Sequence, residues 1–328
     1  MQTPTFRTLL TALACAACGL GAAATAHAAY VLTEVTRAGY AATALWDINN
    51  NGTMVGYSSV APTDLGSAFI YDGTSFVSLS GPAGAIASYA LGISDTGRVV
   101  GSYTTAALGP SHGFIYAGGS YTTFDVAGAN ETFLRGISPD GRYISGYYST
   151  ATQAGVGFVY DTLLGTIAIV SGPTSVFTIA QGINSSGMVA GGDILAGPPS
   201  TRPGFLYDIA TGTRTDQSIA GATRTALRSI DDAGLVAGWF LDAGGQHGFF
   251  GSVASYEQID FAGADFTTTE GSNNARFLVG QYFVGDTSHA YLATPVPEPA
   301  TWGLLAAGLT ALAWSRARPR AKPRLTVV

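Results

Sequence analysis

Three histidines are the residues of this chain that most invite a chemical interpretation. His112, His247 and His289 recur at equivalent places in a repeated pattern, and imidazoles that converge from three repeats could bind zinc. No His-x-His pair or suitably spaced carboxylate accompanies them. The repetition itself explains the histidines, so we expect neither a metal nor a cofactor.

Short turns rich in Asp, Asn and Gly form a second group of candidates, because oxygen-rich loops can bind Ca²⁺. The turn at 49–52 reads Asn-Asn-Asn-Gly, and no copy reaches the ligand count of a calcium loop. Tight hairpins need the same residue types for positive φ and local hydrogen bonds. We interpret these segments as turns, with calcium binding as the alternative.

The elements that must position these residues are six repeats of about 45 residues. A turn glycine follows a Gly-Ile or equivalent pair in five copies, and a sixth copy at 271–276 keeps Asn-Asn without the glycine. β-prone runs follow each turn, which indicates adjacent strands. Four antiparallel strands in this length are typical of a propeller blade. The sequence therefore predicts an all-β, six-bladed β-propeller over residues 29–294.

The sixth repeat stops after its third strand, and the segment 30–36 has the pattern of the missing fourth. Glu34 takes the place that Asp125 and Asp260 hold in complete repeats. We predict that this N-terminal strand completes the last blade and hides an edge that would otherwise be open to aggregation.

Aromatic residues end the second strand of most repeats and should lie toward one face of the propeller. They can stack on sugars, or they can fill the space between blades. The candidate glycan-stacking residues are Tyr57, Tyr103, Tyr147, Trp239 and Tyr282.

The strands around the three repeat histidines, with a Gly-Phe or similar pair after them, resemble the HAF family of bacterial extracellular repeats. The resemblance spans about residues 44–294. It implies an extracellular location and brings no settled activity with it.

Residues 1–28 have the order of a secretion signal: a basic residue, the apolar run 9–24 and a small-x-small site. We expect signal peptidase to cleave after Ala28, at a site defined by Ala26, Ala28 and Ala29. Cys18 leaves a lipoprotein signal as an alternative, although the residues before it lack the expected Leu.

Residues 295–328 combine a Pro-Glu-Pro motif, the apolar run 300–314 and a basic end. As a helix the apolar run would span about 22 Å, short of the ~30 Å hydrocarbon core, and the basic end would remain in the cytoplasm. We therefore expect a short transmembrane helix that anchors the chain transiently in the inner membrane. The motif is Val296, Pro297, Glu298 and Pro299, and the basic cluster is Arg316, Arg318, Arg320, Lys322 and Arg324.

This three-part tail resembles the PEP-CTERM sorting signal of Gram-negative bacteria that make extracellular polysaccharide. The resemblance implies processing near the motif by an exosortase, a membrane protease-transpeptidase. An ordinary tail anchor is the alternative.

Charge and motif content narrow the function further. Between residues 29 and 295, nine basic side chains stand against twenty acidic ones, a net charge of −11 that makes nucleic acid an unsuitable partner. No nucleophile elbow, phosphate loop or HExxH motif is present. We expect a non-enzymatic surface or extracellular-matrix protein of a biofilm that binds exopolysaccharide or surface proteins. The alternative is a secreted polysaccharide hydrolase or lyase with carboxylates at the propeller channel.

Overall fold

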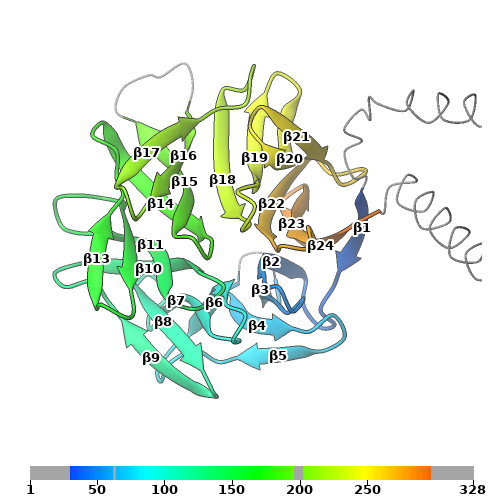
Figure 1. Cartoon of the computed structure of the whole chain (residues 1–328). Coiled ribbons are helices and arrows are strands. Elements are labelled where there is room, and N and C mark those ends of the chain that lie inside the picture. The colour runs from blue at the N-terminus through cyan, green and yellow to red at the C-terminus, as the bar shows by residue number, and fades with distance from the viewer. Residues whose placement is uncertain (1–29, 62–63, 196–201, 297–328) are drawn as a thin grey trace, which may run out of the picture. The chain divides into compact units, whose positions relative to one another are not determined.

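Six four-stranded sheets make up the part of the chain that can be described, residues 30–61, 64–195 and 202–296 of a computed structural model. Each sheet is one blade, and the blades follow one another around a central axis (Figure 1). The prediction of an all-β, six-bladed β-propeller is confirmed.

The strands of the six blades have the following bounds. The first blade contains β2 (Ala42–Ile48), β3 (Met54–Ser59), β4 (Ser67–Tyr71) and β5 (Phe76–Leu79). The second contains β6 (Ala87–Ile93), β7 (Val99–Thr104), β8 (Ser111–Ala117) and β9 (Ser120–Phe124). The third contains β10 (Glu131–Ile137), β11 (Tyr143–Ser149), β12 (Val156–Asp161) and β13 (Thr166–Ile169). The fourth contains β14 (Ser175–Ile183), β15 (Met188–Leu195), β16 (Gly204–Asp208) and β17 (Thr213–Gln217). The fifth contains β18 (Arg224–Ile230), β19 (Val236–Asp242), β20 (Gly245–Ser252) and β21 (Ser255–Ile259). The sixth contains β22 (Phe266–Ser272), β23 (Leu278–Val284), β24 (Thr287–Pro295) and β1 (Tyr30–Val35).

One strand of each blade, which we call the inner strand, lines the axis, and these strands are β2, β6, β10, β14, β18 and β22. The turn between the inner and the second strand closes on a left-handed residue, Gly52 with φ 82° in the first blade. In the sixth blade Arg276 takes this place with φ 64°, the one positive φ outside glycine among the described residues. A non-glycine residue in this conformation costs roughly 1–2 kcal/mol. The sixth repeat nevertheless keeps the turn, with Arg276 in place of the glycine.

A second glycine lets the inner and second strands approach closely. A Cβ on Gly56 would lie 1.9 Å from the carbonyl oxygen of Ala44 and 3.1 Å from the ring of Phe69. The equivalent glycine of every other blade would bring a Cβ within 1.9–2.4 Å of an inner-strand carbonyl, so no side chain fits. These six glycines, called the strand glycines below, are Gly56, Gly101, Gly146, Gly191, Gly238 and Gly280.

The core lies between neighbouring blades. One aromatic residue of each third strand is fully buried, and it packs against residues of the preceding blade. Phe114, for example, contacts Val55, Ala68 and Leu79 of the first blade. Burying such a ring contributes about 1.5–3 kcal/mol. The six residues are Phe69, Phe114, Phe158, Phe205, Phe249 and Tyr291.

The first strand of the chain completes the last blade. β1 pairs antiparallel with β24 over six residues, with Glu34 opposite Tyr291 (Figure 1). Its side chains enter two cores: Val35 packs in the cluster of Phe69, and Leu32 packs in that of Tyr291. Glu34 Oε1 also lies 3.1 Å from His289 Nδ1. The two ends of the repeat array are therefore held together by main-chain and side-chain contacts.

The predicted signal peptide, residues 1–28, and the predicted helix 300–314 lie outside the described residues. Within the described ranges, no helix is long and apolar enough to cross a membrane.

Removing β1 tests how much this closure stabilises the propeller. A chain that starts at residue 37 should melt at least about 10 °C below a chain that starts at residue 30, because it loses a strand pairing and two core contacts. Differential scanning calorimetry of the two chains measures the change. Equal melting temperatures would show that the ring does not depend on this strand.

Candidate functional site

One residue of each inner strand is turned into the central channel by a β-bulge. The register between the inner and second strands shifts at the same place in every blade, as between Leu45 and Asp47 in the first. A bulge leaves one residue unpaired and re-aims its side chain. The six residues at the bulges, called the bulge ring below, are Trp46, Leu91, Arg135, Gln181, Arg228 and Glu270.

Side chains of the bulge ring meet across the axis. The Arg135 guanidinium lies 4.6 Å from the ring centroid of Trp46, although the two belong to the third and first blades. Arg228 of the fifth blade lies 5.9 Å from the same ring. Arg135 Nε also donates to Gln181 Oε1 at 3.0 Å. The Trp46 indole in the channel therefore has two guanidinium groups near its ring, an arrangement that the ring's electrons favour.

The charges in the channel are poorly balanced. Arg228 Nε lies 3.3 Å from Glu270 Oε2, the one ion pair that the described bulge-ring residues make. Burial lowers the pKa of Arg135 to about 10, and Arg228 adds to this, but the side chain stays protonated at neutral pH. Burial raises the pKa of Asp47 to about 7, although the backbone N–H groups of Ile93 and Ile48 oppose the shift. Near pH 7, the two guanidinium groups thus share the channel with Glu270 and a partly protonated Asp47.

Several polar atoms of the channel lack partners. Among the described residues, Trp46 Nε1, Arg228 Nε and Glu270 Oε2 are buried and make no hydrogen bond. The Arg228–Glu270 pair is close enough for charge attraction, but its orientation does not meet hydrogen-bond geometry. The bulge ring borders a cavity of about 50 Å³, which has room for a few water molecules. Small polar molecules can therefore complete these contacts.

The oxygen-rich turns form the wall at one end of the channel, which we call the turn end. Asn49 Oδ1 accepts hydrogen bonds from Asn51 N and Thr53 N within its own turn, while its Nδ2 donates to Ser94 O of the next blade at 2.9 Å. Asn184 makes the same set of bonds. Because the turns use their oxygens internally, the structure supports reading them as turns. In the described part of the chain, no three His, Cys, Asp or Glu side chains converge as a metal site requires.

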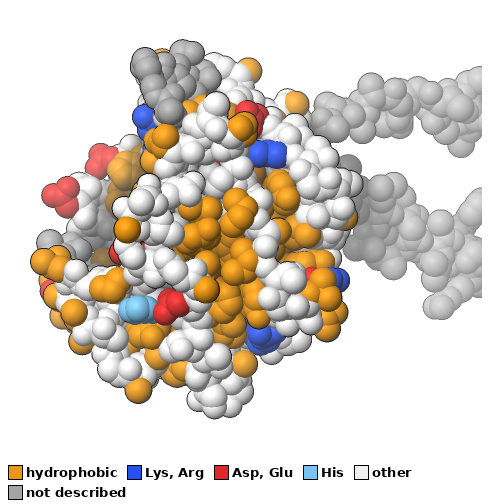
Figure 2. All heavy atoms as spheres, turned by 90° about the vertical axis from the view of Figure 1, so that its left-hand side faces the viewer, with side chains coloured by type: hydrophobic (Ala, Val, Ile, Leu, Met, Phe, Trp, Pro, Cys, Tyr) orange, Lys and Arg blue, Asp and Glu red, His pale blue; other side chains and the backbone are white. Residues whose placement is uncertain are grey.

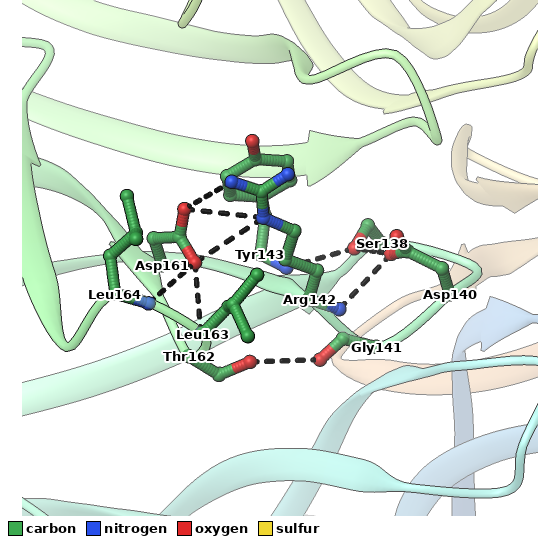
Figure 3. A network of polar contacts seen from close by, with 9 residues as sticks. All are labelled: Ser138, Asp140, Gly141, Arg142, Tyr143, Asp161, Thr162, Leu163 and Leu164. Carbon is green, nitrogen blue, oxygen red and sulfur yellow. Dashed lines mark hydrogen bonds and ion pairs between the residues drawn. The ribbon is translucent and has the colours of Figure 1, made fainter.

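The third blade has a closed polar network at this end (Figure 3). Arg142 Nη2 donates to Asp161 at 2.8 Å, and the same carboxylate accepts from the backbone N–H groups of Leu163 and Leu164. The hydrogen bond from Arg142 lowers the pKa of Asp161. The network connects two hairpins, and its charged groups already bind one another instead of a ligand.

The opposite end of the channel, called the aromatic end, carries five rings in two contacting groups, which together are called the aromatic run below. Phe133 and Tyr147 stack at 4.5 Å between centroids, and Tyr147 lies 5.2 Å from Phe177 of the next blade. Tyr57 meets Tyr89 edge to face at 4.9 Å. All five rings are partly exposed, and they come from four consecutive blades. The run is therefore accessible from solvent.

The register separates the five predicted glycan-stacking residues. Tyr57, Tyr147 and Trp239 directly follow a strand glycine, whereas Tyr103 and Tyr282 come one residue later. Successive side chains point to opposite faces of a strand, so the two sets cannot form one surface.

Burial then leaves three of the five with little ring surface for a sugar to stack on. Tyr103 is 8% and Tyr282 6% exposed, and both pack between blades, Tyr282 against Phe261 at 3.8 Å. Trp239 is also 6% exposed. Tyr103 and Tyr282 therefore fill the space between blades, and of the five only Tyr57 and Tyr147 remain on the accessible run.

Sequence reasoning did not single out Tyr89, Phe133 and Phe177 of the inner strands, nor the bulge ring. The available signal was an aromatic residue a few positions before the Gly-Ile pair. Its direction depends on the bulge, because one extra residue changes which face each later side chain takes.

Each of the three repeat histidines pairs with a carboxylate within its own blade. His112 pairs with Asp125 at 2.9 Å, His247 with Asp260 at 3.0 Å and His289 with Glu34 at 3.1 Å. Each imidazole also lies 4.9–5.5 Å from an aromatic ring of the second strand of its blade. Because each histidine contacts only its own blade in these pairs, the structure does not bring them together.

Hydrophobic side chains are prominent on the outer surface. They gather across the middle of the face drawn in Figure 2, where charged side chains are few and scattered. In the third blade, Leu163, Leu164, Ile167 and Ile169 are exposed. Such surfaces in a soluble domain often contact other molecules.

Fold and tail define an exported β-propeller. Residues 295–318 match the PEP-CTERM protein-sorting motif, which indicates a protein that an exosortase-type system sorts to the cell envelope or surface. Of the sorting residues, Val296 is described and exposed; Pro297–Pro299, the basic cluster and the signal cleavage site Ala26, Ala28 and Ala29 lie outside the described residues. No match was found among curated proteins.

The solved structures that are similar to the chain include the following three. TolB from Acinetobacter baumannii shares 11% identity at a TM-score of 0.48, covering 78% of this chain and 64% of TolB. The β-propeller domain of the Trilobed protease from Pyrococcus furiosus shares 10% identity at a TM-score of 0.45, covering 78% of this chain and 86% of that domain. A Trypanosoma rangeli sialidase shares 9% identity at a TM-score of 0.49, covering 80% of this chain and 58% of the sialidase chain. The chain thus spans less than two thirds of the TolB and sialidase chains.

The raised pKa of Asp47 gives a pH test of the channel. Because folding favours its protonated form, the contribution of Asp47 to stability is largest below pH 4 and falls as the pH rises through 7. The free energy of unfolding of the native protein, minus that of Asp47→Asn, should therefore fall by about 2–4 kcal/mol between pH 4 and pH 8. Urea denaturation of both proteins across this range measures the difference. If their free energies of unfolding changed in parallel with pH, the raised pKa of Asp47 would be contradicted.

Proposed function

We propose that this protein is a non-enzymatic surface or extracellular-matrix protein that binds glycan at the aromatic end of its propeller. The observation that carries the proposal is the run of partly exposed rings from Tyr57 to Phe177. Binding sites for small organic ligands combine aromatic walls with a few polar groups, and the guanidinium groups nearby supply the latter. The neighbouring strands fix the rings before a ligand arrives, which reduces the entropy cost of binding.

The channel carboxylates favour binding over catalysis. Asp47 accepts hydrogen bonds from two backbone N–H groups at 2.9 Å, and Glu270 is paired with Arg228. The cavity beside them holds about 50 Å³, room for water rather than for a sugar ring. A hydrolase or lyase that uses these carboxylates is the second candidate, since burial raises the pKa of Asp47 to about 7, a value suited to an acid.

Sorting supports a place outside the cell. The PEP-CTERM motif at 295–318 accounts for export, and the repeats resemble HAF-family extracellular repeats. We infer that signal peptidase removes residues 1–28, that the tail anchors the chain transiently in the inner membrane, and that an exosortase-like enzyme processes it near Pro297–Pro299. The released propeller would then join an exopolysaccharide matrix or bind surface proteins there.

Changes in the aromatic run should weaken glycan binding. Tyr147→Ala removes a partly exposed ring and should lower the affinity for the best saccharide on a glycan array at least about tenfold. Tyr207→Ala, which removes a partly buried tyrosine near the turn end, is the matched control and should bind normally. An array without any bound saccharide would overturn the glycan proposal, and saccharide turnover by the purified protein would favour the hydrolase or lyase.

The sorting proposal predicts the mass and location of the mature protein in a host that has an exosortase. The native chain should start near Ala29, end near Pro297 and lie outside the cell. Glu298→Ala should keep its tail and remain in the inner membrane. Intact-mass spectrometry of cell fractions tests both statements, and identical products from the two chains would make the tail an ordinary anchor.

A further inference from the structure

We propose that the glycan bound at the aromatic end is anionic, and that Arg224 and Arg228 bind its carboxylate or sulfate oxygens in a groove between the fourth and fifth blades. This inference rests on the proposed function and names the chemical class of the ligand.

The groove exists because the fourth blade lacks a side chain where three of its counterparts carry rings. Gly192 follows the strand glycine, at the position that Tyr57, Tyr147 and Trp239 occupy in their blades. Among the described residues, a Cβ added to Gly192 would meet only Ala226 Cα, at 4.0 Å, so none of them fills the space beside it. The groove holds about 80 Å³ and is lined in part by Phe177, Ile179, Arg224, Arg228 and Trp239.

Both arginines of the proposed site converge on one indole. The guanidinium of Arg224 lies 4.7 Å from the ring centroid of Trp239, and that of Arg228 lies 5.9 Å from it. Each guanidinium carries five N–H donors in a plane, a geometry that matches carboxylate and sulfate oxygens. Phe177 and Ile179 add an apolar wall, continuous with the aromatic run.

The arginines have few anionic partners. Of the nine basic residues between 29 and 295, four lie at this groove or in the adjoining channel: Arg135, Arg202, Arg224 and Arg228. Neither Arg202 nor Arg224 makes an ion pair with any described residue. Burial lowers the pKa of Arg224, and the neighbouring Arg202 and Arg228 lower it further. An anion placed here would relieve the repulsion among these cations.

The one acidic residue among the described lining residues of the groove, Asp193, already has other partners. Asp193 accepts hydrogen bonds from Ser175 and Thr178 at 2.7 Å and pairs with Arg214. It therefore leaves Arg224 without a carboxylate, although it lines the same groove.

Two buried donors at the groove make no hydrogen bond with any described residue. Trp239 is 6% exposed, and its Nε1–H makes no hydrogen bond with any described residue. The same holds for Arg228 Nε, which is buried beside it. A buried donor without an acceptor costs about 1–3 kcal/mol, and oxyanion oxygens entering the groove are the acceptors that these positions lack.

The test compares saccharides that differ in charge. Calorimetric titration of the full-length protein with trigalacturonate should give an affinity at least tenfold higher than with its neutral methyl ester. A sulfated galactan oligosaccharide shows whether sulfate or carboxylate is the better oxyanion. Arg224→Gln should remove the preference for charge. Arg142→Gln, which makes the same charge change at the turn end, is the control and should keep it.

Inorganic sulfate probes the anion site without a sugar. At equal ionic strength, replacing chloride by sulfate should raise the melting temperature of the native protein and of Arg142→Gln by several degrees more than that of Arg224→Gln. Equal affinity for charged and neutral saccharides overturns the anionic assignment while glycan binding stands. If no saccharide binds but sulfate still discriminates the variants, the anion site stands and the glycan function fails. Equal sulfate effects in all three proteins overturn the site.

Discussion

The close contact between the inner and second strands at the strand glycines is the constraint on which the rest of the structure depends. At Gly56 the inner-strand carbonyl occupies space that a Cβ would need, and the same contact recurs in all six blades. Directly after the inner-strand partner of this glycine comes the bulge, which sets one residue per blade free from the ladder. The fold thereby gives the channel six side chains that no strand pairing restricts. Their identity can vary between blades without a change in the architecture.

This division explains why the two ends of the channel differ. Residues after the bulge enter the turns, where Asn, Ser and Asp side chains satisfy the backbone and connect neighbouring blades. Residues before it belong to regular pairing, where Phe133 and Tyr147 meet across two strands. Cross-strand aromatic pairs stabilise a sheet by about 0.2–1 kcal/mol each. The aromatic end thus combines local stability with exposed ring surface, while the turn end uses its polar groups internally.

The sequence was sufficient for those features that repeat and insufficient for those that depend on register. Turn glycines spaced by one blade length predicted six blades, because each repeat had to place the same hairpin at the same point of a ring. The sorting motif was equally readable, since its three parts follow one another along the chain. The aromatic residues were harder, because Tyr147 and Tyr282 look equivalent in the sequence and yet project from opposite faces. The bulge ring could not be foreseen, because Trp46 and Glu270 share only a position that the register shift defines.

The charge distribution connects the channel to the setting in which an exported protein works. A domain with a net charge of −11 repels polyanions over most of its surface, and this repulsion weakens beyond a Debye length of roughly 8 Å at physiological salt. Four of the nine basic residues gather at the groove and the adjoining channel, and they make this mouth more basic than the rest of the surface. An anionic polymer would then be excluded from the rest of the domain and directed to that mouth, so the same charges that bind it would also orient it. Specificity for one end of the propeller follows from this contrast, because an evenly basic surface would hold the polymer in any orientation.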